Sequence, residues 1–166
     1  MKAVPCEAQM TTAITRPAIV VEAMSWLGTP YRHQASLKGV GCDCLGLLRG
    51  LWRAFYHEEP EALPAYTPDW AEAQGAETLA EAAGRHLTAI PVADAAAADV
   101  LLFRWRSNLP AKHAAILIEA DRFIHAQQGA AVSLAALTPW WRRRIAYAFR
   151  FPGVDDGFPY ALTPRT

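Results

Sequence analysis

The chain has 166 residues, of which 52% are hydrophobic and 19% are charged, so it can bury one sizeable core but is short for two domains. Its 16 Lys and Arg residues balance its 16 Asp and Glu residues, which excludes a general attraction to nucleic acid or anionic lipid. Three cysteines imply no disulfide framework, and no segment resembles a secretory signal or a membrane span. We expect one globular domain, cytoplasmic when synthesised, without nucleic-acid or membrane partners.

The first predicted helix begins after Thr15, a residue that can cap it, and has Pro17 in its first turn. Its buried stripe would consist of Val20, Ala23, Met24 and Leu27, and Gly28 and Pro30 would end it. The connector 29–40 is unusually rich in polar and aromatic residues, among them Tyr31 and His33. Two interpretations stay open for this connector: the wall of a substrate cleft, or an ordinary solvated loop.

A second helix is predicted to begin at Cys44, because apolar residues recur from there at three- and four-residue steps. Gly39 and Gly41 allow a tight turn before it. The sulfur would lie beside unpaired backbone amides at the positive end of the helix dipole, which lowers the pKa of a thiol. A buried structural cysteine is the simpler interpretation, but the carboxylate of Asp43 and the downstream histidines favour a nucleophile.

The middle of the chain predicts connections and one weak helix. Residues 58–68 hold three prolines and should form an extended surface connection that acts as a spacer. Residues 69–87 are rich in alanine and predict a third helix, interrupted by Gly75 and Gly84, with His86 at the surface. Residues 91–99 read as a second connector.

From Val100 onward the pattern predicts strands, at 100–103, 113–119, 123–127 and 142–151, with a turn at 119–122. Helices followed by an antiparallel sheet predict an α+β fold with the helices packed on the sheet. We expect an N-terminal extension at 1–14, a single domain at 15–151 and a tail at 152–166. His113 would open one strand and His125 would lie on the next. A three-residue loop between the strands would place both on the same face, since side chains alternate.

Several blocks of the sequence, in this order, together resemble the NlpC-type cell-wall peptidases, which are papain-like cysteine peptidases that cut peptidoglycan stem peptides. The blocks are Trp26-Leu27-Gly28-Thr29-Pro30-Tyr31, Gly41-Cys42-Asp43-Cys44-Leu45-Gly46-Leu47, Ala98-Asp99-Val100-Leu101-Leu102-Phe103, His113-Ala114-Ala115-Ile116-Leu117-Ile118 and Phe123-Ile124-His125-Ala126. The resemblance covers residues 16–151 and is strongest to the branch found in prophages and gene transfer agents. It implies the papain-like NlpC-type fold.

The resemblance also implies site residues. Cys44 matches the nucleophile, His113 the catalytic base and His125 the polar residue that orients the base. Tyr31 matches a tyrosine that lines the cleft near the reactive carbonyl, and Asp43 an aspartate that helps to hold a free peptide N-terminus. The backbone amide of Cys44 would belong to the oxyanion hole. No metal or other cofactor is implied.

Three positions depart from the family pattern. Leu45 replaces a small hydroxyl residue after the nucleophile, Ala98 replaces a glycine before Asp99, and Cys42 replaces an apolar residue. Leu45 removes a hydroxyl acceptor, which weakens the case for recognition of a substrate amine and leaves open the alternative of a wider tolerance for substrates still attached to sugar. We expect Ala98 to affect only a turn and Cys42 to be a buried small residue, with a redox-resolving role as the alternative.

The expected activity is therefore hydrolysis of a stem peptide, next to D-glutamate and before the diamino acid, at the cell wall and as part of a phage-like particle. A carboxylate at Asp43 and a tyrosine at Tyr31 would favour a substrate with a free amine. Partners would be the stem peptide and phage-like tail proteins. The alternatives are a zinc site at Cys42, Cys44, His113 and His125, a catalytically silent binding or tail module, and a papain-like acyltransferase.

Overall fold

A computed structural model describes residues 14–67 and 75–155 of the chain. Its main element is a six-stranded antiparallel sheet with strand order β4-β9-β5-β6-β7-β8. The strands are β4 (Thr88–Ile90), β5 (Val100–Phe103), β6 (His113–Glu119), β7 (Arg122–His125), β8 (Ser133–Ala136) and β9 (Ile145–Arg150). The helices are α1 (Arg16–Met24), α2 (Cys44–Tyr56), α4 (Thr78–His86) and α5 (Pro139–Arg142), with a 3₁₀ turn, η1, at Val92–Asp94. The predicted α+β class is confirmed.

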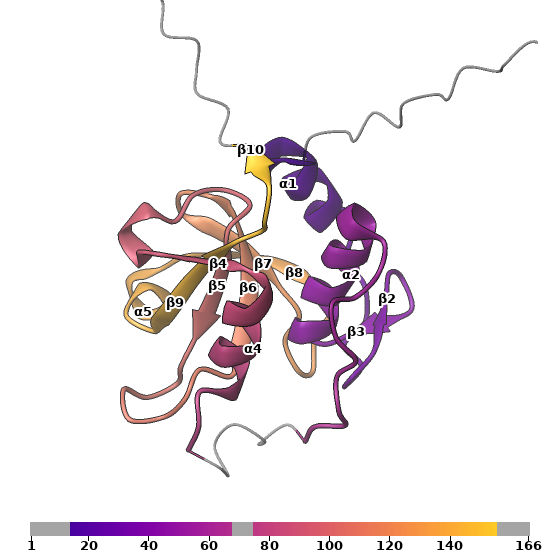
Figure 1. The fold of residues 1–166 in the computed structure, drawn as a ribbon. Coiled ribbons are helices and arrows are strands. Elements are labelled where there is room, and N and C mark those ends of the chain that lie inside the picture. The colour runs from indigo at the N-terminus through magenta and orange to yellow at the C-terminus, as the bar shows by residue number, and fades with distance from the viewer. Residues whose placement is uncertain (1–13, 68–74, 156–166) are drawn as a thin grey trace, which may run out of the picture.

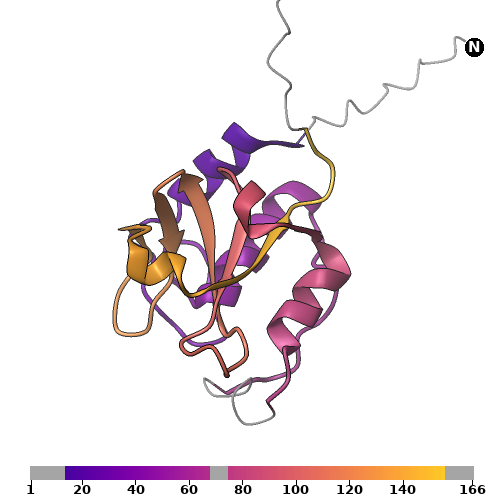
Figure 2. The ribbon, with the colours of Figure 1, turned by 90° about the vertical axis from the view of Figure 1, so that its left-hand side faces the viewer.

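Helices α1 and α2 lie together beside the sheet, and α2 packs on its central strand β6 (Figure 1). Because side chains alternate along each strand, Leu102 and Ile116 face these helices, whereas Leu101 and Ala115 face the other way. The second face is buried by residues that follow β8, including Leu137 and Trp141, and Figure 2 shows the sheet from a second side. Burial of both faces explains why every residue of β5 is buried.

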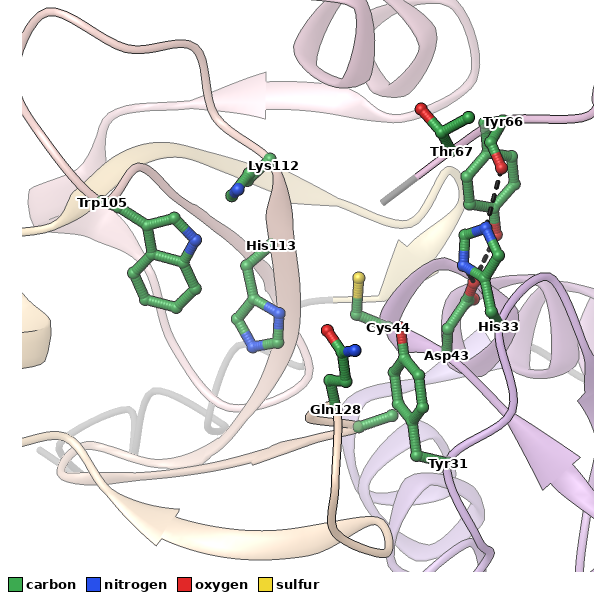
Figure 3. A pocket seen from close by; sticks show the side chains of 11 residues that line it. Tyr31, His33, Asp43, Cys44, Tyr66, Thr67, Trp105, Lys112, His113 and Gln128 are labelled. Atoms are coloured by element: carbon green, nitrogen blue, oxygen red, sulfur yellow. Dashed lines mark hydrogen bonds and ion pairs between the residues drawn. The ribbon is translucent and has the colours of Figure 1, made fainter. Parts of the chain in front are cut away.

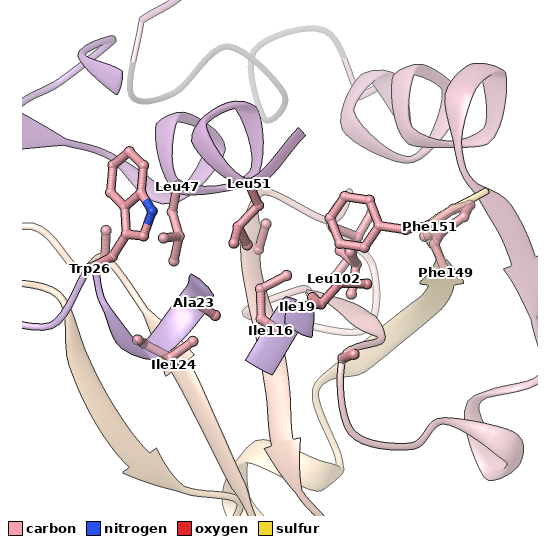
Figure 4. Packing of buried hydrophobic residues seen from close by; sticks show 14 of the residues in the cluster. Ile19, Ala23, Trp26, Leu47, Leu51, Leu102, Ile116, Ile124, Phe149 and Phe151 are labelled. Atoms are coloured by element: carbon pink, nitrogen blue, oxygen red, sulfur yellow. The ribbon is translucent and has the colours of Figure 1, made fainter. Parts of the chain in front are cut away.

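The helix-side core joins α1, α2 and the sheet (Figure 4). Leu47 and Leu51 of α2 are fully buried, as the apolar periodicity predicts. Gly50 lets α2 approach the end of α1 closely, because a Cβ at this position would lie 2.0 Å from the Trp26 ring. The position of Cys44 at the start of α2 therefore depends on packing along the whole helix.

The first helix agrees with prediction at its start and differs in its buried face. The hydroxyl of Thr15 accepts a hydrogen bond from the Ala18 amide at 3.3 Å, which caps α1. The helix ends at Met24, and the chain beyond turns so that Trp26 is buried while Leu27 is 41% exposed. The predicted place of Leu27 in the buried stripe is wrong because the helical period stops before it.

The short elements were not predicted. Strands β4 and β8 and helix α5 have three or four residues each, and unlike the equally short β5 none of them is a continuous buried apolar run. The alanine-rich segment forms α4 only from Thr78, because Gly75 has a φ of +63° and the chain turns there. The earlier part of that predicted helix, residues 69–74, lies outside the described residues.

Two further pairs of short strands complete the fold. Strands β2 (Ser36–Leu37) and β3 (Gly41–Cys42) form a hairpin just before α2, with Gly39 in its turn at a φ of +76°. Strands β1 (Ile14–Thr15) and β10 (Val154–Asp155) pair in parallel where the described chain begins and ends (Figure 1). The predicted domain limits of 15–151 stay a prediction, and residues 1–13 and 156–166 lie outside the described parts. None of the helices within 14–67 and 75–155 combines the length and apolarity that a membrane crossing requires.

Candidate active site

The predicted nucleophile, Cys44, is the first residue of α2, and Asp43 is its N-cap. The Asp43 Oδ1 atom accepts a hydrogen bond from the Gly46 amide at 2.7 Å, so the capping carboxylate satisfies one of the amides of the first turn. Gly46 itself is required by close packing, since a Cβ there would lie 1.9 Å from the carbonyl oxygen of Ala35. The hairpin and the helix start thus hold Cys44 from both sides.

The Cys44 thiol is not acidified in the free protein, contrary to the prediction from its position at the helix start. The residue is partly exposed to a cavity, but the packing around its sulfur removes water and raises the thiol pKa to about 11. Backbone hydrogen bonds at Ala114, Leu45 and Cys44 act in the opposite direction, and the charge of Asp43 adds to the increase. Desolvation therefore outweighs the helix amides.

His113 and His125 lie together on the sheet. Their rings are joined by a 2.9 Å hydrogen bond between His113 Nε2 and His125 Nδ1, and both residues are buried, at 7% and 3% exposure. Burial, and then the neighbouring His125, lowers the pKa of His113 to about 3, and burial lowers that of His125 to about 4. Both imidazoles are therefore neutral at neutral pH.

A β-bulge, rather than a three-residue loop, aligns the two histidines. The turn between β6 and β7 contains only Ala120 and Asp121, and the register shifts between Leu117 and Glu119. The extra residue, Ile118, changes the alternation by one and restores the shared face. The prediction of a common face is confirmed, and the predicted loop length is wrong.

The ring contacts determine which nitrogen of His113 can serve the thiol. Because Nε2 contacts His125, Nδ1 is the nitrogen left for Cys44, and Figure 3 shows that both side chains lie at the cavity. If Nδ1 accepts the thiol proton, the proton of neutral His113 lies on Nε2 and is donated to His125 Nδ1. His125 then carries its own proton on Nε2.

Aromatic rings enclose the histidine pair. Trp105 stacks on His113, with ring centroids 5.7 Å apart and an interplanar angle of 23°. Trp141 presents its ring to His125 at 5.5 Å and 90°, and Phe123 lies edge-on to His125 at 4.9 Å. These contacts exclude water and fix the imidazole planes, which accounts for the lowered pKa values. Sequence reasoning did not single out Trp105 or Trp141.

The cavity in front of Cys44 has a volume of about 180 Å³. Figure 3 shows side chains from the connector after α1, the start of α2, the segment after α2 and strand β6 converging on it. Its lining residues are Tyr31, His33, Asp43, Cys44, Tyr66, Thr67, Trp105, Lys112, His113, Ala126 and Gln128. The structure thus brings together Cys44, His113, Tyr31 and Asp43, and joins His125 to them through His113.

Asp43 is buried, at 3% exposure, and its carboxylate has partners on both oxygens. The Oδ2 atom accepts hydrogen bonds from the Gln34 amide at 2.7 Å and from the Tyr66 hydroxyl at 2.6 Å, and His33 Nδ1 lies 3.6 Å away. Tyr31 stands beside it with a raised pKa, caused by burial and then by the charges of Asp43 and Cys44. The Tyr31 hydroxyl therefore stays protonated and available as a donor.

Tyr66 is the main residue that sequence reasoning missed. The segment after α2 was predicted to act as a spacer, but it folds back over the start of the helix. The Tyr66 carbonyl accepts hydrogen bonds from His33 Nε2 at 2.7 Å and from the Gln34 side chain at 2.5 Å. An aromatic residue between Pro64 and Pro68 was the available signal. Of the connector 29–40, Tyr31 and His33 line the cavity, so the cleft-wall interpretation holds for these two residues.

The remaining predictions concern Cys42 and metals. Cys42 is fully buried, as expected for a small core residue, and burial raises the pKa of its thiol to about 12. Cys42 and Cys44 are both free thiols. Within the described parts of the chain, no three side chains of His, Cys, Asp or Glu converge as a metal site would require.

Comparison with known proteins identifies the family. The family model described as NlpC/P60 family matches residues 28–150, which is most of the chain. None of the curated proteins compared with the chain matches it. The NlpC/p60 domain of the peptidoglycan hydrolase SagA is 25% identical, with a TM-score of 0.58 over 83% of this chain and 100% of that one.

Two further solved structures share the fold at lower identity. An NlpC/P60 family protein from Bacillus cereus is 18% identical, with a TM-score of 0.62 over 85% of this chain and 41% of its own. The peptidoglycan hydrolase RipB from Mycobacterium tuberculosis is 16% identical, with a TM-score of 0.51 over 81% of this chain and 63% of its own. The chain thus spans all of the SagA domain but less than half of the Bacillus protein. It belongs to the NlpC/P60 family, whose members are cysteine peptidases that act on peptidoglycan.

Proposed function

We propose that the protein is a cysteine peptidase that hydrolyses peptidoglycan stem peptides at the bond between D-glutamate and the diamino acid. Cys44 is the nucleophile, His113 the general base and acid, and His125 the positioning residue. The observation that carries this proposal is the 2.9 Å hydrogen bond between the two histidines, because it joins His125 to His113, which lines the same cavity as Cys44. A purely structural pair of histidines would not require a thiol across an open cavity.

The reaction begins from a neutral pair, because burial raises the pKa of Cys44 and lowers that of His113. As the sulfur attacks the scissile carbonyl carbon, the thiol proton moves to His113 Nδ1. The same proton is then given to the leaving amine, which leaves a thioester on Cys44. Water, deprotonated by His113, attacks the thioester carbon, the carbon–sulfur bond breaks and the thiol is regenerated.

His125 supports each proton transfer by accepting a hydrogen bond from the N–H group at His113 Nε2. This bond keeps the proton of neutral His113 on Nε2, so that Nδ1 can accept the proton of the thiol. The imidazolium formed in the first step is stabilised by the same hydrogen bond. The developing oxyanion would be held by the backbone amide of Cys44, with the Tyr31 hydroxyl as a second donor near the carbonyl. Tyr31 and Asp43 form the substrate-binding side of the cleft.

The test is digestion of purified peptidoglycan followed by identification of the fragments by mass spectrometry. A new amino terminus on the diamino acid supports the proposal, and cleavage at any other bond contradicts the assigned specificity. Activity should survive EDTA and be lost after treatment with iodoacetamide, because the reactive group is a thiol. Binding of peptidoglycan without fragments would favour a silent module, and transfer of the acyl group to an added amine or alcohol would favour an acyltransferase.

We also propose that the enzyme reaches the wall with a phage-like particle, in contact with tail proteins. This part rests on the resemblance of its sequence blocks to the phage-associated branch alone. Sedimentation of particles from induced cultures, followed by mass spectrometry, tests it. Detection of the chain in intact particles would support it, and its presence only in the free protein fraction would refute it.

A further inference from the structure

The carboxylate of Asp43, the group expected to hold a substrate amine, is already occupied by the protein's own donors. Its Oδ1 accepts from the Gly46 amide at 2.7 Å, and its Oδ2 accepts from the Gln34 amide at 2.7 Å and the Tyr66 hydroxyl at 2.6 Å. A carboxylate oxygen accepts about two hydrogen bonds. The oxygen nearest the segment that carries Tyr66 is therefore saturated.

The donors on Asp43 Oδ2 are held in place by a second set of contacts. His33 Nε2 lies 2.7 Å from the Tyr66 carbonyl, and the Gln34 side chain donates to the same carbonyl at 2.5 Å. Because a carbonyl only accepts, Nε2 of His33 carries a proton. The Tyr66 ring also meets the His33 ring edge-on at 5.1 Å. The contacts from His33 and Gln34 thus hold Tyr66 in a position from which its hydroxyl reaches Asp43.

Apart from Asp43, no described residue that lines the cavity carries a negative charge that could pair with a substrate ammonium group. Asp43 is the one carboxylate among the described residues that line the cavity. Leu45, next to Cys44, has no hydroxyl and lines an adjoining, mainly apolar cavity instead. A partly desolvated ammonium group requires an opposite charge and several acceptors. This side of the cleft suits a neutral group better.

We propose that Tyr66 is a specificity-determining residue whose hydroxyl occupies the Asp43 carboxylate, so that the site accepts stem peptides with an acylated, uncharged N-terminus, such as those still attached to the sugar. This inference rests on the proposed function. It replaces recognition of a free substrate amine by Asp43 with binding of substrates whose N-terminal amine is acylated. The Tyr66 hydroxyl occupies an acceptor position on Asp43 Oδ2, and a substrate ammonium group would have to displace it to bind there.

The experiment compares a free stem tripeptide with its N-acetylated form, using wild-type protein and Tyr66→Phe. In the wild type we expect kcat/KM for the acetylated peptide to equal or exceed that for the free peptide. Tyr66→Phe frees one acceptor position on a charged carboxylate, so the ratio of free to acetylated kcat/KM should rise about tenfold. Tyr56→Phe is the matched control, because its hydroxyl donates to the Pro152 carbonyl at 2.6 Å away from the cleft. It should leave the ratio unchanged.

Two outcomes would overturn the inference. The first is a wild-type preference of tenfold or more for the free peptide that Tyr66→Phe weakens, which would mean that Tyr66 helps to hold the amine. The second is an unchanged ratio in Tyr66→Phe. Calorimetric binding of both peptides to Cys44→Ala protein, with and without Tyr66→Phe, measures the same ratio without turnover. If wild-type protein cleaves nothing, the proposed function fails, while the binding ratio still supports or refutes the role of Tyr66.

Discussion

The side of the cleft that carries the histidines is built from strands and rings, whereas the side that carries Asp43 is built from loops and hydrogen bonds. We call the first the histidine wall (Trp105, His113, His125 and Trp141) and the second the loop wall (Tyr31, His33, Asp43 and Tyr66). In the histidine wall the imidazoles are desolvated and neutral. In the loop wall a buried charge is satisfied by three hydrogen-bond donors. Changes in the first should therefore alter chemistry, and changes in the second should alter stability and substrate choice.

The largest effect is expected at Cys44, which lies between the two walls. Cys44→Ala should lower kcat/KM by about 10⁴-fold or more while leaving the fold intact, because no other group can form the thioester. Cys42→Ala is the matched control: its side chain is fully buried in the core and does not line the cavity, so most activity should remain. Equal losses in the two variants would contradict the assignment.

The histidine wall should show graded losses in peptide hydrolysis. His113→Ala removes the base and should cost about 10³-fold in kcat. His125→Ala should cost about 10²-fold, and His125→Asn should recover part of this, because an amide oxygen can still accept the Nε2 proton of His113. If His125→Ala equalled His113→Ala, or if the Asn variant gave no recovery, the positioning role would be refuted.

The free energy of unfolding should depend on pH through the histidine wall and the thiol. In the unfolded chain the histidines titrate near 6.5, whereas in the folded protein burial lowers the pKa of His113 to about 3 and of His125 to about 4. The unfolded chain binds more protons in this window, so stability should fall as the pH drops from about 6.5 toward 3. The Cys44 pKa is raised from 9.0 to about 11. Stability should therefore also fall as the pH rises above about 9.

Urea denaturation between pH 4 and pH 10 measures this dependence. His113→Ala should reduce the fall of the free energy of unfolding at acidic pH. That fall arises because the unfolded chain binds a proton at His113 that the folded protein does not bind. Cys44→Ala should reduce the alkaline slope. A wild-type protein that became more stable on acidification would contradict the neutral state of the histidine pair.

The loop wall should respond in stability. Asp43→Ala removes the cap of α2 and leaves the Gly46, Gln34 and Tyr66 donors without their shared acceptor. We expect a loss of about 2 to 4 kcal/mol in the free energy of unfolding, measured by urea denaturation. Asp43→Asn keeps an acceptor oxygen and should lose about half as much. Unchanged stability in Asp43→Ala would mean that the loop wall does not depend on this carboxylate.

The smallest effect is expected away from both walls, at Ala98. This residue has a φ of +77°, where a Cβ is unfavourable, and it precedes the buried Asp99 that pairs with Arg16 at 3.0 Å and with Arg150 at 3.1 Å. Ala98→Gly should raise the free energy of unfolding by up to about 1 kcal/mol, because glycine adopts this conformation without strain. Peptidase activity should not change. A decrease in stability would show that the Ala98 methyl group contributes more by packing than it costs.

Comparison of the two walls shows which parts of the site could be predicted from the sequence. His113 and His125 are 12 positions apart on neighbouring strands, so strand periodicity and a turn place them on a common face. Even here the bulge at Ile118 was hidden, since both faces of β6 are buried and its nearly continuous apolar run shows no alternation that a one-residue shift could disturb. Tyr66 is 23 positions from Asp43 and lies in a segment without regular structure, so no periodic signal connects the two residues.

The sequence by itself determined the α+β class, the start of α2 at Cys44, the strands of the histidine pair and the membership of the blocks in one family. These features follow from local patterns: apolar periodicity, capping residues and glycine turns. The tertiary structure alone decided the protonation states and the occupancy of Asp43. The pKa of a thiol depends on how much water its surroundings remove, and at Cys44 packing outweighed the amides of the helix start. Whether a carboxylate is free for a ligand depends on donors that arrive from distant loops, and only folding brings those donors to it.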